Sequence, residues 1–263
     1  MMTILMKILQ KKAKEVQQIN RETFPTNEYK KVPTFYETIR VNHKMGVIAE
    51  IKRASPSKGM INEHVDPVQQ AKLYEQHGAS AISVLTDTPF FKGTMEDLQN
   101  VRAAVNIPIL CKDFIIDEIQ IDRAKAYGAN IILLIAAALD DAHLRRLYDY
   151  AISLNLEVLC EVHNEEEMER VLQLNPRLVG VNNRDLKTFH VDLQTTNRLA
   201  KMVRNNDIIF ISESGIETGA DVAIVKDAGA EAILVGETLM RAANVANKME
   251  EFQLPFEEKK GVK

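Results

Sequence analysis

The first predicted strand and the loop that follows it have the sequence Gly46-Val-Ile-Ala-Glu-Ile-Lys-Arg-Ala-Ser-Pro-Ser-Lys-Gly59. Successive side chains of a strand point to opposite faces, so Glu50 and Lys52 are expected on one face, opposite Ile51. A carboxylate and an ammonium on one face of a buried strand indicate either a functional site or a structural ion pair. The serines, proline and glycine that follow are typical of a loop that could hold a charged ligand.

Seven further apolar runs repeat this pattern. With the first, they are Val47–Ile51, Ala81–Leu85, Ile107–Cys111, Asn130–Ile135, Leu156–Cys160, Leu178–Val181, Ile208–Ile211 and Ala232–Val235. Amphipathic helical stretches lie between them, among them Asp66–His77, Asp117–Tyr127, Asp140–Ser153, Glu165–Leu174 and Thr218–Ala228. Gly128 and Gly229 each follow a helix, where a left-handed cap is common. Eight such units without a linker predict an α/β fold, a single (β/α)₈ TIM barrel.

The segment before the first strand predicts an extra helical cap on this barrel. Positions 4, 5, 8 and 9 are apolar and Lys7 interrupts them, which is helical spacing and not a secretory signal. We expect an amphipathic helix to about Asn20 within an N-terminal helical extension over residues 1–45. The barrel core is expected over residues 46–250 and a polar C-terminal tail over residues 251–263, all within one domain of residues 1–263.

The composition argues against several classes of protein. A net charge of −4 and a pI of about 5.9 do not suit a nucleic-acid or anionic-membrane surface. The longest apolar run, Ile131 to Leu139, is far shorter than the roughly 20 residues of a membrane span. Cys111 and Cys160 fall inside predicted strands, and no cysteine or histidine has metal-ligand spacing. We therefore expect a cytoplasmic protein with no metal, as a monomer or alternatively a homo-oligomer.

Polar side chains accumulate where the predicted strands end, which is where such barrels carry their active sites. These are Glu50, Lys52, Lys112, Asp113, Glu161, the run Asn182 to Asp185, the run Ser212 to Gly215, Gly236 and Glu237. Isolated buried charges are costly and are usually paired for a purpose, so a converging acid/base cluster explains them better than solvated strand ends do. If Lys112 and Glu161 face the lumen, Cys111 and Cys160 face the helices.

Two glycine-bearing loops suggest a phosphate site. Ser214-Gly215 follows the seventh strand and Gly236-Glu237 the eighth. Glycine lets backbone amides approach an anion, and the loops after strands 7 and 8 commonly bind phosphate in barrels. The alternative is that these glycines only make tight turns. Ser55 could donate a further hydrogen bond from the first loop.

Phe91, Leu133 and Leu134 are candidates for an apolar wall. Phe91 follows the second strand, and the two leucines lie near the end of the fourth. They either contact an aromatic substrate or belong to the plain core.

Six motifs, in order along the chain, together resemble the indole-3-glycerol phosphate synthase family. They are Glu50 to Gly59, Leu110-Cys-Lys-Asp-Phe-Ile115, Cys160-Glu-Val-His163, Gly180-Val-Asn-Asn-Arg-Asp-Leu186, Ser212-Glu-Ser-Gly-Ile216, and Val235-Gly236 with Leu239-Met240-Arg241. The resemblance implies a carboxy-lyase of tryptophan biosynthesis. Its reaction is ring closure of 1-(2-carboxyphenylamino)-1-deoxyribulose 5-phosphate, with loss of carbon dioxide and water, to give indole-3-glycerol phosphate. The implied partner is this small molecule, with no cofactor.

The resemblance also implies a role for each matched residue. Lys112 would protonate the substrate ketone, and Glu161 would be the acid/base group of the dehydration. Lys52 and Arg184 would hold the anthranilate carboxylate, and Lys52 is alternatively a proton-transfer group. Glu50, Asn182 and Glu213 would orient the lysines and the sugar hydroxyls of the substrate. The phosphate would be bound by Ser55, Ser214, Gly215, Gly236 and the backbone of Glu237. The apolar wall would consist of Phe91, Leu133 and Leu134.

Three positions depart from the family pattern. Members often have serine where Glu237 stands, and smaller residues are expected where Lys92 and Thr94 stand. Two other functions stay as alternatives. One is an isomerase acting on phosphoribosyl anthranilate, which needs no lysine pair on strands 1 and 3. The other is a barrel that binds a phosphate ligand without turnover.

Overall fold

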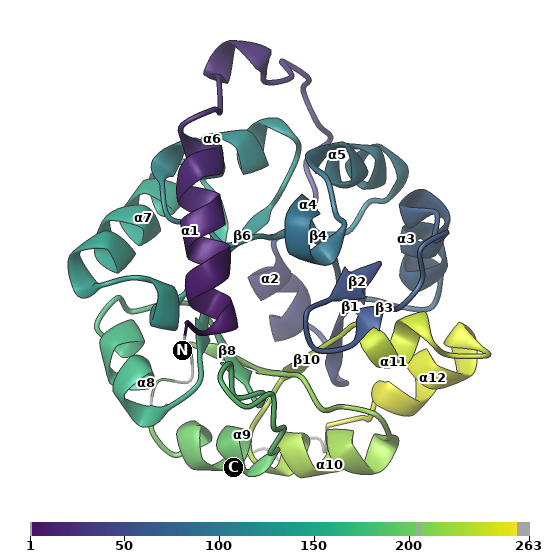
Figure 1. The fold of residues 1–263 in the computed structure, drawn as a ribbon. Coiled ribbons are helices and arrows are strands. Elements are labelled where there is room, and N and C mark those ends of the chain that lie inside the picture. Colours follow the sequence, from purple (N-terminus) through teal and green to yellow (C-terminus); the bar gives the residue numbers. More distant parts are fainter. Residues whose placement is uncertain (1, 204, 206, 257–263) are drawn as a thin grey trace.

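The computed structural model describes residues 2–203, 205 and 207–256, and its centre is a closed barrel (Figure 1). All neighbouring strands pair in parallel, in the order β1-β10-β9-β8-β7-β6-β5-β4. The strands are β1 (Gly46–Ile51), β4 (Ala81–Leu85), β5 (Ile109–Lys112), β6 (Ile131–Ile135), β7 (Glu157–Val162), β8 (Leu178–Asn182), β9 (Ile209–Glu213) and β10 (Ala232–Val235). Each overlaps one of the predicted apolar runs, with ends that differ by up to two residues, so the (β/α)₈ TIM barrel is confirmed.

Helices surround the barrel (Figure 1). They are α3 (Pro67–Gln76), α5 (Met95–Ala104), α6 (Glu118–Ala126), α7 (Asp141–Ser153), α8 (Glu165–Leu172), α9 (Gln194–Ala200), α10 (Gly219–Asp227) and α12 (Val245–Phe252). Shorter elements are α4 (Thr88–Phe91), α11 (Glu237–Met240), the hairpin β2 (Ala54–Ser55) with β3 (Gly59–Met60), and 3₁₀ turns at Arg21–Thr23 and Ala136–Ala138. Gly128 and Gly229 have φ angles of 95° and 105°, which glycine adopts readily, as their predicted capping role requires. None of the helices in the described ranges is long and apolar enough to cross a membrane.

Two apolar layers follow from the alternation of side chains along each strand. The inner layer fills the barrel and includes Ile48, Leu110 and Leu133. The outer layer packs the strands against the helices and includes Cys111 and Cys160. The cysteines therefore face the helices as predicted. Both are free, and burial raises the pKa of each thiol to about 12.

The predicted N-terminal helix is α1 (Ile4–Val16), and it lies across the mouth of the barrel (Figure 1). It ends earlier than the expected limit at Asn20. The Asn20 side chain instead accepts a hydrogen bond of 3.0 Å from the backbone of Glu22 and caps the next turn. Asparagine favours such a cap over a helix interior, which explains the difference.

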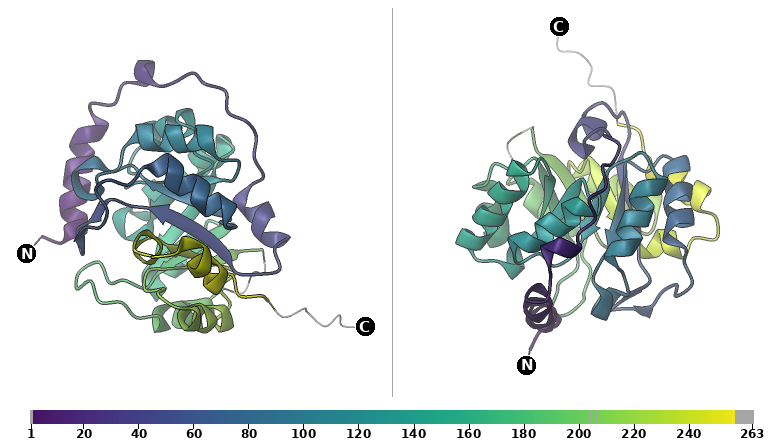
Figure 2. Two further views of the ribbon diagram at one scale, coloured as in Figure 1. Left: turned by 90° about the vertical axis from the view of Figure 1, so that its right-hand side faces the viewer. Right: turned by 90° about the horizontal axis from the view of Figure 1, so that it is seen from above.

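A second helix of the extension, α2 (Phe35–Arg40), closes the opposite end of the barrel, and Figure 2 shows α1 and α2 on opposite sides of the strands. Phe35 and Ile39 join the inner apolar layer. The backbone N–H groups of Phe35 and Tyr36 donate to the Glu157 carboxylate at 2.6 and 2.8 Å. The extension thus covers both ends of the barrel, where the sequence predicted one cap.

The last helix runs past the expected core boundary at residue 250. It ends at Phe252, whose side chain is fully buried, and the Leu254 carbonyl accepts a hydrogen bond of 2.8 Å from Met45. The first residues of the predicted tail therefore pack against the barrel. Residues 257–263 of that tail lie outside the described ranges.

Candidate active site

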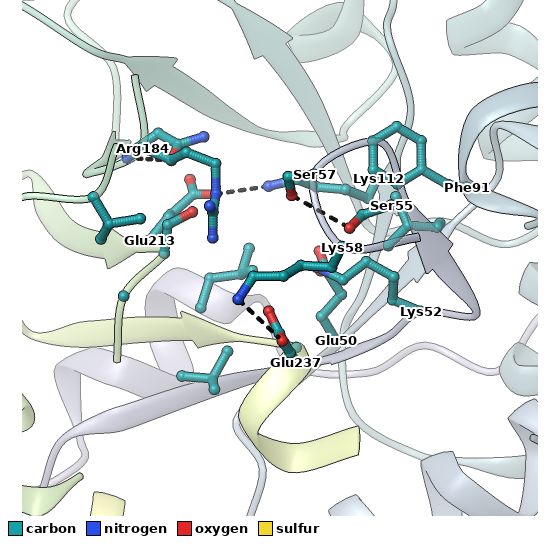
Figure 3. Close-up of a pocket in the computed structure, with 18 of the residues that line it drawn as sticks. Glu50, Lys52, Ser55, Ser57, Lys58, Phe91, Lys112, Arg184, Glu213 and Glu237 are labelled. Carbon is teal, nitrogen blue, oxygen red and sulfur yellow. Dashed lines mark hydrogen bonds and ion pairs between the residues drawn. The ribbon is translucent and has the colours of Figure 1, made fainter. Parts of the chain in front are cut away.

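A pocket of about 950 Å³ opens at the C-terminal ends of the strands (Figure 3), and residues of α1 line part of it. Nearly all the residues proposed from the sequence line it. They are Glu50, Lys52, Ser55, Phe91, Lys112, Leu133, Glu161, Asn182, Arg184, Glu213, Ser214, Gly215, Gly236 and Glu237. Strand ends from all around the barrel supply them, so the expected convergence of charges is present.

Leu134 is the exception and corrects the predicted apolar wall. It is fully buried and belongs to the outer layer between β6 and the helices. Leu133, its neighbour, faces the lumen and lines the pocket. Adjacent strand residues point to opposite faces, so only one of the two leucines can contact a ligand.

Lys112 lies at the centre of the charged cluster. Its Nζ is 2.6 Å from Glu213 Oε2 and 3.4 Å from Glu161 Oε2. On β1, Lys52 Nζ is 2.8 Å from Glu50 Oε1, so these two side chains share a face as predicted. The three glutamates are almost completely buried, whereas 14% of the Lys112 side chain is exposed to the pocket.

Proximity outweighs burial for most of these charges. Burial lowers the pKa of Lys112, but the charges of Glu213, Glu161 and Glu50 raise it above the ordinary lysine value. Burial raises the pKa of Glu161, but the Lys112 and His163 charges and the Asn182 hydrogen bond hold it below the usual glutamate range. The ammonium of Lys112 is therefore stably protonated at neutral pH, as a proton donor requires.

Glu213 differs from Glu161 because its carboxylate has fewer partners. Glu161 Oε1 accepts 3.2 Å from Asn182 Nδ2, whereas Glu213 Oε1 is buried with no hydrogen-bond partner in the described chain. Burial and the nearby Glu161 charge therefore raise the pKa of Glu213. Gly180 makes room for this carboxylate, since a Cβ at that position would stand 2.1 Å from Glu213 Oε1.

The candidate phosphate loops, which follow β1, β9 and β10, all line the pocket. Ser214 and Gly215 have φ angles of 66° and 83°, so the chain after β9 makes a sharp left-handed bend. The Ser55 and Ser57 hydroxyls lie 3.4 Å apart in the loop after β1. Glu237, at the start of α11, pairs with two cations at its Oε1: Lys58 Nζ at 3.4 Å (Figure 3) and Arg241 Nε at 3.2 Å.

The apolar side of the pocket is larger than the sequence indicated. The Phe91 ring lies 5.9 Å, centroid to centroid, from the Phe114 ring. Further apolar residues at the pocket are Ile4, Leu5 and Ile8 of α1 and, on the loop after β8, Leu186, Phe189 and Val191. Alternation could have found Phe114, which stands two residues after Lys112. The contributions of α1 and of the loop depend on tertiary packing.

Arg184 stands on that loop, which folds back as a hairpin beside the pocket. Residues 184 and 191 form an antiparallel bridge, and Arg184 Nη1 donates to the Phe189 carbonyl at 3.3 Å. Lys92 and Thr94, which depart from the family pattern, have structural positions. Lys92 ends α4 with a φ angle of 60°, and Thr94 caps α5.

Lys12 ties α1 to the barrel and was not singled out from the sequence. Its buried Nζ lies 2.8 Å from Asp113 Oδ1, 2.9 Å from Asp87 Oδ2 and 3.0 Å from Glu15 Oε2. Burial lowers the pKa of Lys12, but the charges of Asp113 and Asp87 raise it well above the ordinary value. Lys12 thus ties α1 to Asp113, the residue that follows Lys112 in the sequence.

Among the described residues, no group of three or more His, Cys, Asp or Glu side chains is arranged to hold a metal ion. The lysines, arginines and hydroxyls of the pocket lining suit an anionic organic ligand, and carboxylates and Asn182 lie beside them.

Known proteins resemble this chain over almost its whole length. The family model described as indole-3-glycerol phosphate synthase matches residues 5–252. An indole-3-glycerol phosphate synthase of Oceanobacillus iheyensis is 52% identical over 260 residues, covering 98% of this chain and 99% of the relative. One of Bacillus mycoides is 49% identical over 249 residues, covering 95% and 97%.

Solved structures support the fold alone. A 3-hexulose-6-phosphate synthase superimposes with a TM-score of 0.63 at 19% identity, covering 79% of this chain and 98% of that one. An N-acetylmannosamine-6-phosphate 2-epimerase from Clostridium perfringens gives 0.62 at 16% identity, covering 82% and 94%. Because the family model matches nearly the whole chain and the six family motifs meet at one pocket, this chain belongs to the indole-3-glycerol phosphate synthase family.

Proposed function

We propose that this pocket closes the indole ring of 1-(2-carboxyphenylamino)-1-deoxyribulose 5-phosphate and releases carbon dioxide, water and indole-3-glycerol phosphate. The chain is thus a carboxy-lyase of tryptophan biosynthesis. The observation that carries the residue roles is Lys112, a protonated lysine held between two buried carboxylates and facing a partly apolar pocket.

Lys112 serves as the general acid of ring closure. The ring carbon that carries the carboxylate attacks the ketone carbon, and a carbon–carbon bond forms as the ketone oxygen takes a proton from the Lys112 ammonium. The bond to the carboxylate then breaks, carbon dioxide leaves, and its electron pair restores the aromatic ring. The contacts with Glu213 and Glu161 keep the ammonium charged and aimed into the pocket.

Glu161 serves the dehydration. The new hydroxyl leaves as water after taking a proton, while a carbon-bound proton of the forming ring is removed, and the double bond closes the indole. Glu161 exchanges the proton, and Asn182, 3.2 Å away, orients its carboxylate. One negative charge is lost with the carboxylate, so each turnover takes one proton from solvent.

Three parts of the pocket hold the three parts of the substrate. Lys52 and Arg184 bind the anthranilate carboxylate, and Phe91, Leu133 and the Phe114 ring contact the aromatic ring. The phosphate lies at Ser55, Ser214, Gly215, Gly236 and the backbone of Glu237. Lys58 and Arg241 support this assignment because they neutralise the Glu237 side chain, whose charge would otherwise repel the phosphate.

The direct test is fluorescence. The chain has six tyrosines and no tryptophan, so the indole emission window is nearly dark before reaction. Purified protein, given the substrate and no cofactor, should produce growing indole emission. Binding of the substrate without emission would favour the non-catalytic barrel, and turnover of phosphoribosyl anthranilate would favour the isomerase.

Replacing Ser214 by aspartate should raise KM about tenfold or more relative to Ser214→Asn, because a carboxylate beside the phosphate costs at least about 1.4 kcal/mol of binding. Both side chains tolerate the left-handed backbone of residue 214, so the pair differs chiefly in charge. The measurement is steady-state kinetics of the two variants. Equal KM values would remove Ser214 from the phosphate site.

We also propose that the enzyme acts as a cytoplasmic monomer without a nucleic-acid partner. In support, one chain supplies all the pocket residues named above, and the cysteines are free buried thiols, as in most proteins of reducing compartments. The net charge of −4 does not favour nucleic acid.

A further inference from the structure

His163 lies directly behind Glu161 and is not used by the chemistry above. It follows β7, and its Nε2 is 3.3 Å from Glu161 Oε1. This contact is an ion pair by distance, and His163 Nε2 makes no hydrogen bond within the described chain. On its other side, His163 Nδ1 is 3.0 Å from Glu167 Oε2 in the first turn of α8.

The surroundings of this imidazole favour its charged form. Only 10% of the His163 side chain is exposed, and among the described residues the ionisable groups within ion-pair distance of it are the carboxylates of Glu161 and Glu167. Burial lowers the pKa of His163, but these two carboxylates raise it to about 10. Glu167 is itself held by Asn164 Nδ2 at 2.8 Å and by the His163 backbone N–H at 2.8 Å, so the imidazolium is fixed from both sides.

We propose that His163 is a positioning residue: held by Glu167 as an imidazolium, it keeps the Glu161 carboxylate ionised and directed into the pocket. This inference rests on the proposed function, in which Glu161 exchanges the proton of the dehydration. The groups in contact with Glu161 are Lys112 on β5, Asn182 on β8 and His163, and the Glu213 carboxylate on β9 faces it across Lys112. Of the three groups in contact with Glu161, Lys112 and Asn182 line the pocket, whereas His163 lies outside its lining.

The test is the pH dependence of kcat/KM for His163→Gln. Glutamine keeps a hydrogen-bond donor but removes the charge, so the Glu161 carboxyl should gain its proton at higher pH. We expect the acidic limb of the profile to move up by about one pH unit, because an opposite charge within about 4–6 Å lowers the pKa of a carboxyl group by about that much or more. KM should change less than threefold, since His163 does not touch the substrate.

The matched control is His143→Gln. His143 also pairs with a carboxylate, its Nδ1 lying 2.7 Å from Asp140 Oδ2, but on the surface of α7 and away from the pocket. This variant should reproduce the wild-type profile. In a Glu161→Gln background, His163→Gln should add no further change to the residual kcat/KM.

Glu167→Gln is the second variant, because it leaves the imidazole in place and removes the group that keeps it charged. It should shift the same limb in the same direction by a smaller amount, and NMR should show His163 losing its proton at lower pH than in the wild type. An unmoved limb in both variants, with wild-type turnover intact, would overturn the role of His163. A wild-type protein without turnover would instead overturn the proposed function.

Discussion

Lys112→Ala should lower kcat about a thousandfold or more, with KM changed little. General acid catalysis contributes roughly 10²–10⁴ to a rate, and this variant also removes the cation that lies between Glu161 and Glu213. The remaining carboxylates cannot all stay ionised in so small a buried space, so one takes a proton and the dehydration suffers as well. The measurement is indole emission under single-turnover conditions, with substrate affinity measured separately.

A distant lysine provides the control for this variant. Lys125 lies on the surface of α6, where its Nζ donates to the Leu154 carbonyl at 2.9 Å. Lys125→Ala should retain wild-type kcat. If Lys112→Ala kept kcat within tenfold of wild type, Lys112 would lose its assignment as the general acid.

Lys12→Met should destabilise the protein strongly. Methionine fills a similar volume but removes the cation that lies 2.9 Å from Asp87 and 2.8 Å from Asp113, and leaves Asp113 with Arg123 Nη2 at 3.8 Å. Breaking a buried pair in this way costs about 3–5 kcal/mol. For a chain of this size, 1 kcal/mol corresponds to roughly 2–4 °C in Tm, so we expect Tm to fall by about 10 °C. Thermal unfolding followed by circular dichroism measures it.

The pH dependence of this contribution follows from the raised pKa of Lys12. Its stabilisation is fully present below the ordinary lysine pKa of about 10.4 and is lost only as pH rises through the higher pKa of the folded state, so the deficit should be constant from pH 6 to 9. Lys11→Met, on the exposed side of the same helix, should change Tm very little. A Tm for Lys12→Met close to that of Lys11→Met would mean that the buried ion cluster does not hold α1 in place.

The barrel could be predicted because its signals are local. A buried parallel strand requires a short apolar run, and a helix often ends just before a glycine. Each of these patterns can be recognised within about ten consecutive residues. The site followed from the same signals, because a barrel brings the ends of its strands together whatever lies between them. Glu50, Lys112, Glu161 and Glu213 could thus be grouped before any coordinates were known.

The remaining features depend on contacts between distant parts of the chain. Helical spacing places Lys12 on the apolar face with Leu5 and Ile8 and Lys11 at its edge, but the role of Lys12 is visible only when Asp87 and Asp113 are placed beside it. The role of α2 depends on Glu157, more than a hundred residues away. The error at Leu134 had another cause, since the alternation that was applied to β5 and β7 was not applied to β6.

The N-terminal extension also constrains the order in which this protein can fold. The site that receives α2 includes the carboxylate of Glu157, and the site that receives α1 includes Asp87 and Asp113. On a ribosome, residues 4–40 leave the exit tunnel before any of these partners exists, so their apolar faces must wait while the barrel is made. Both caps close long loops, and each can dock only after the strand or loop that carries its partner carboxylates has been made. The two N-terminal helices are therefore translated first, but they can dock only after later parts of the barrel have been made.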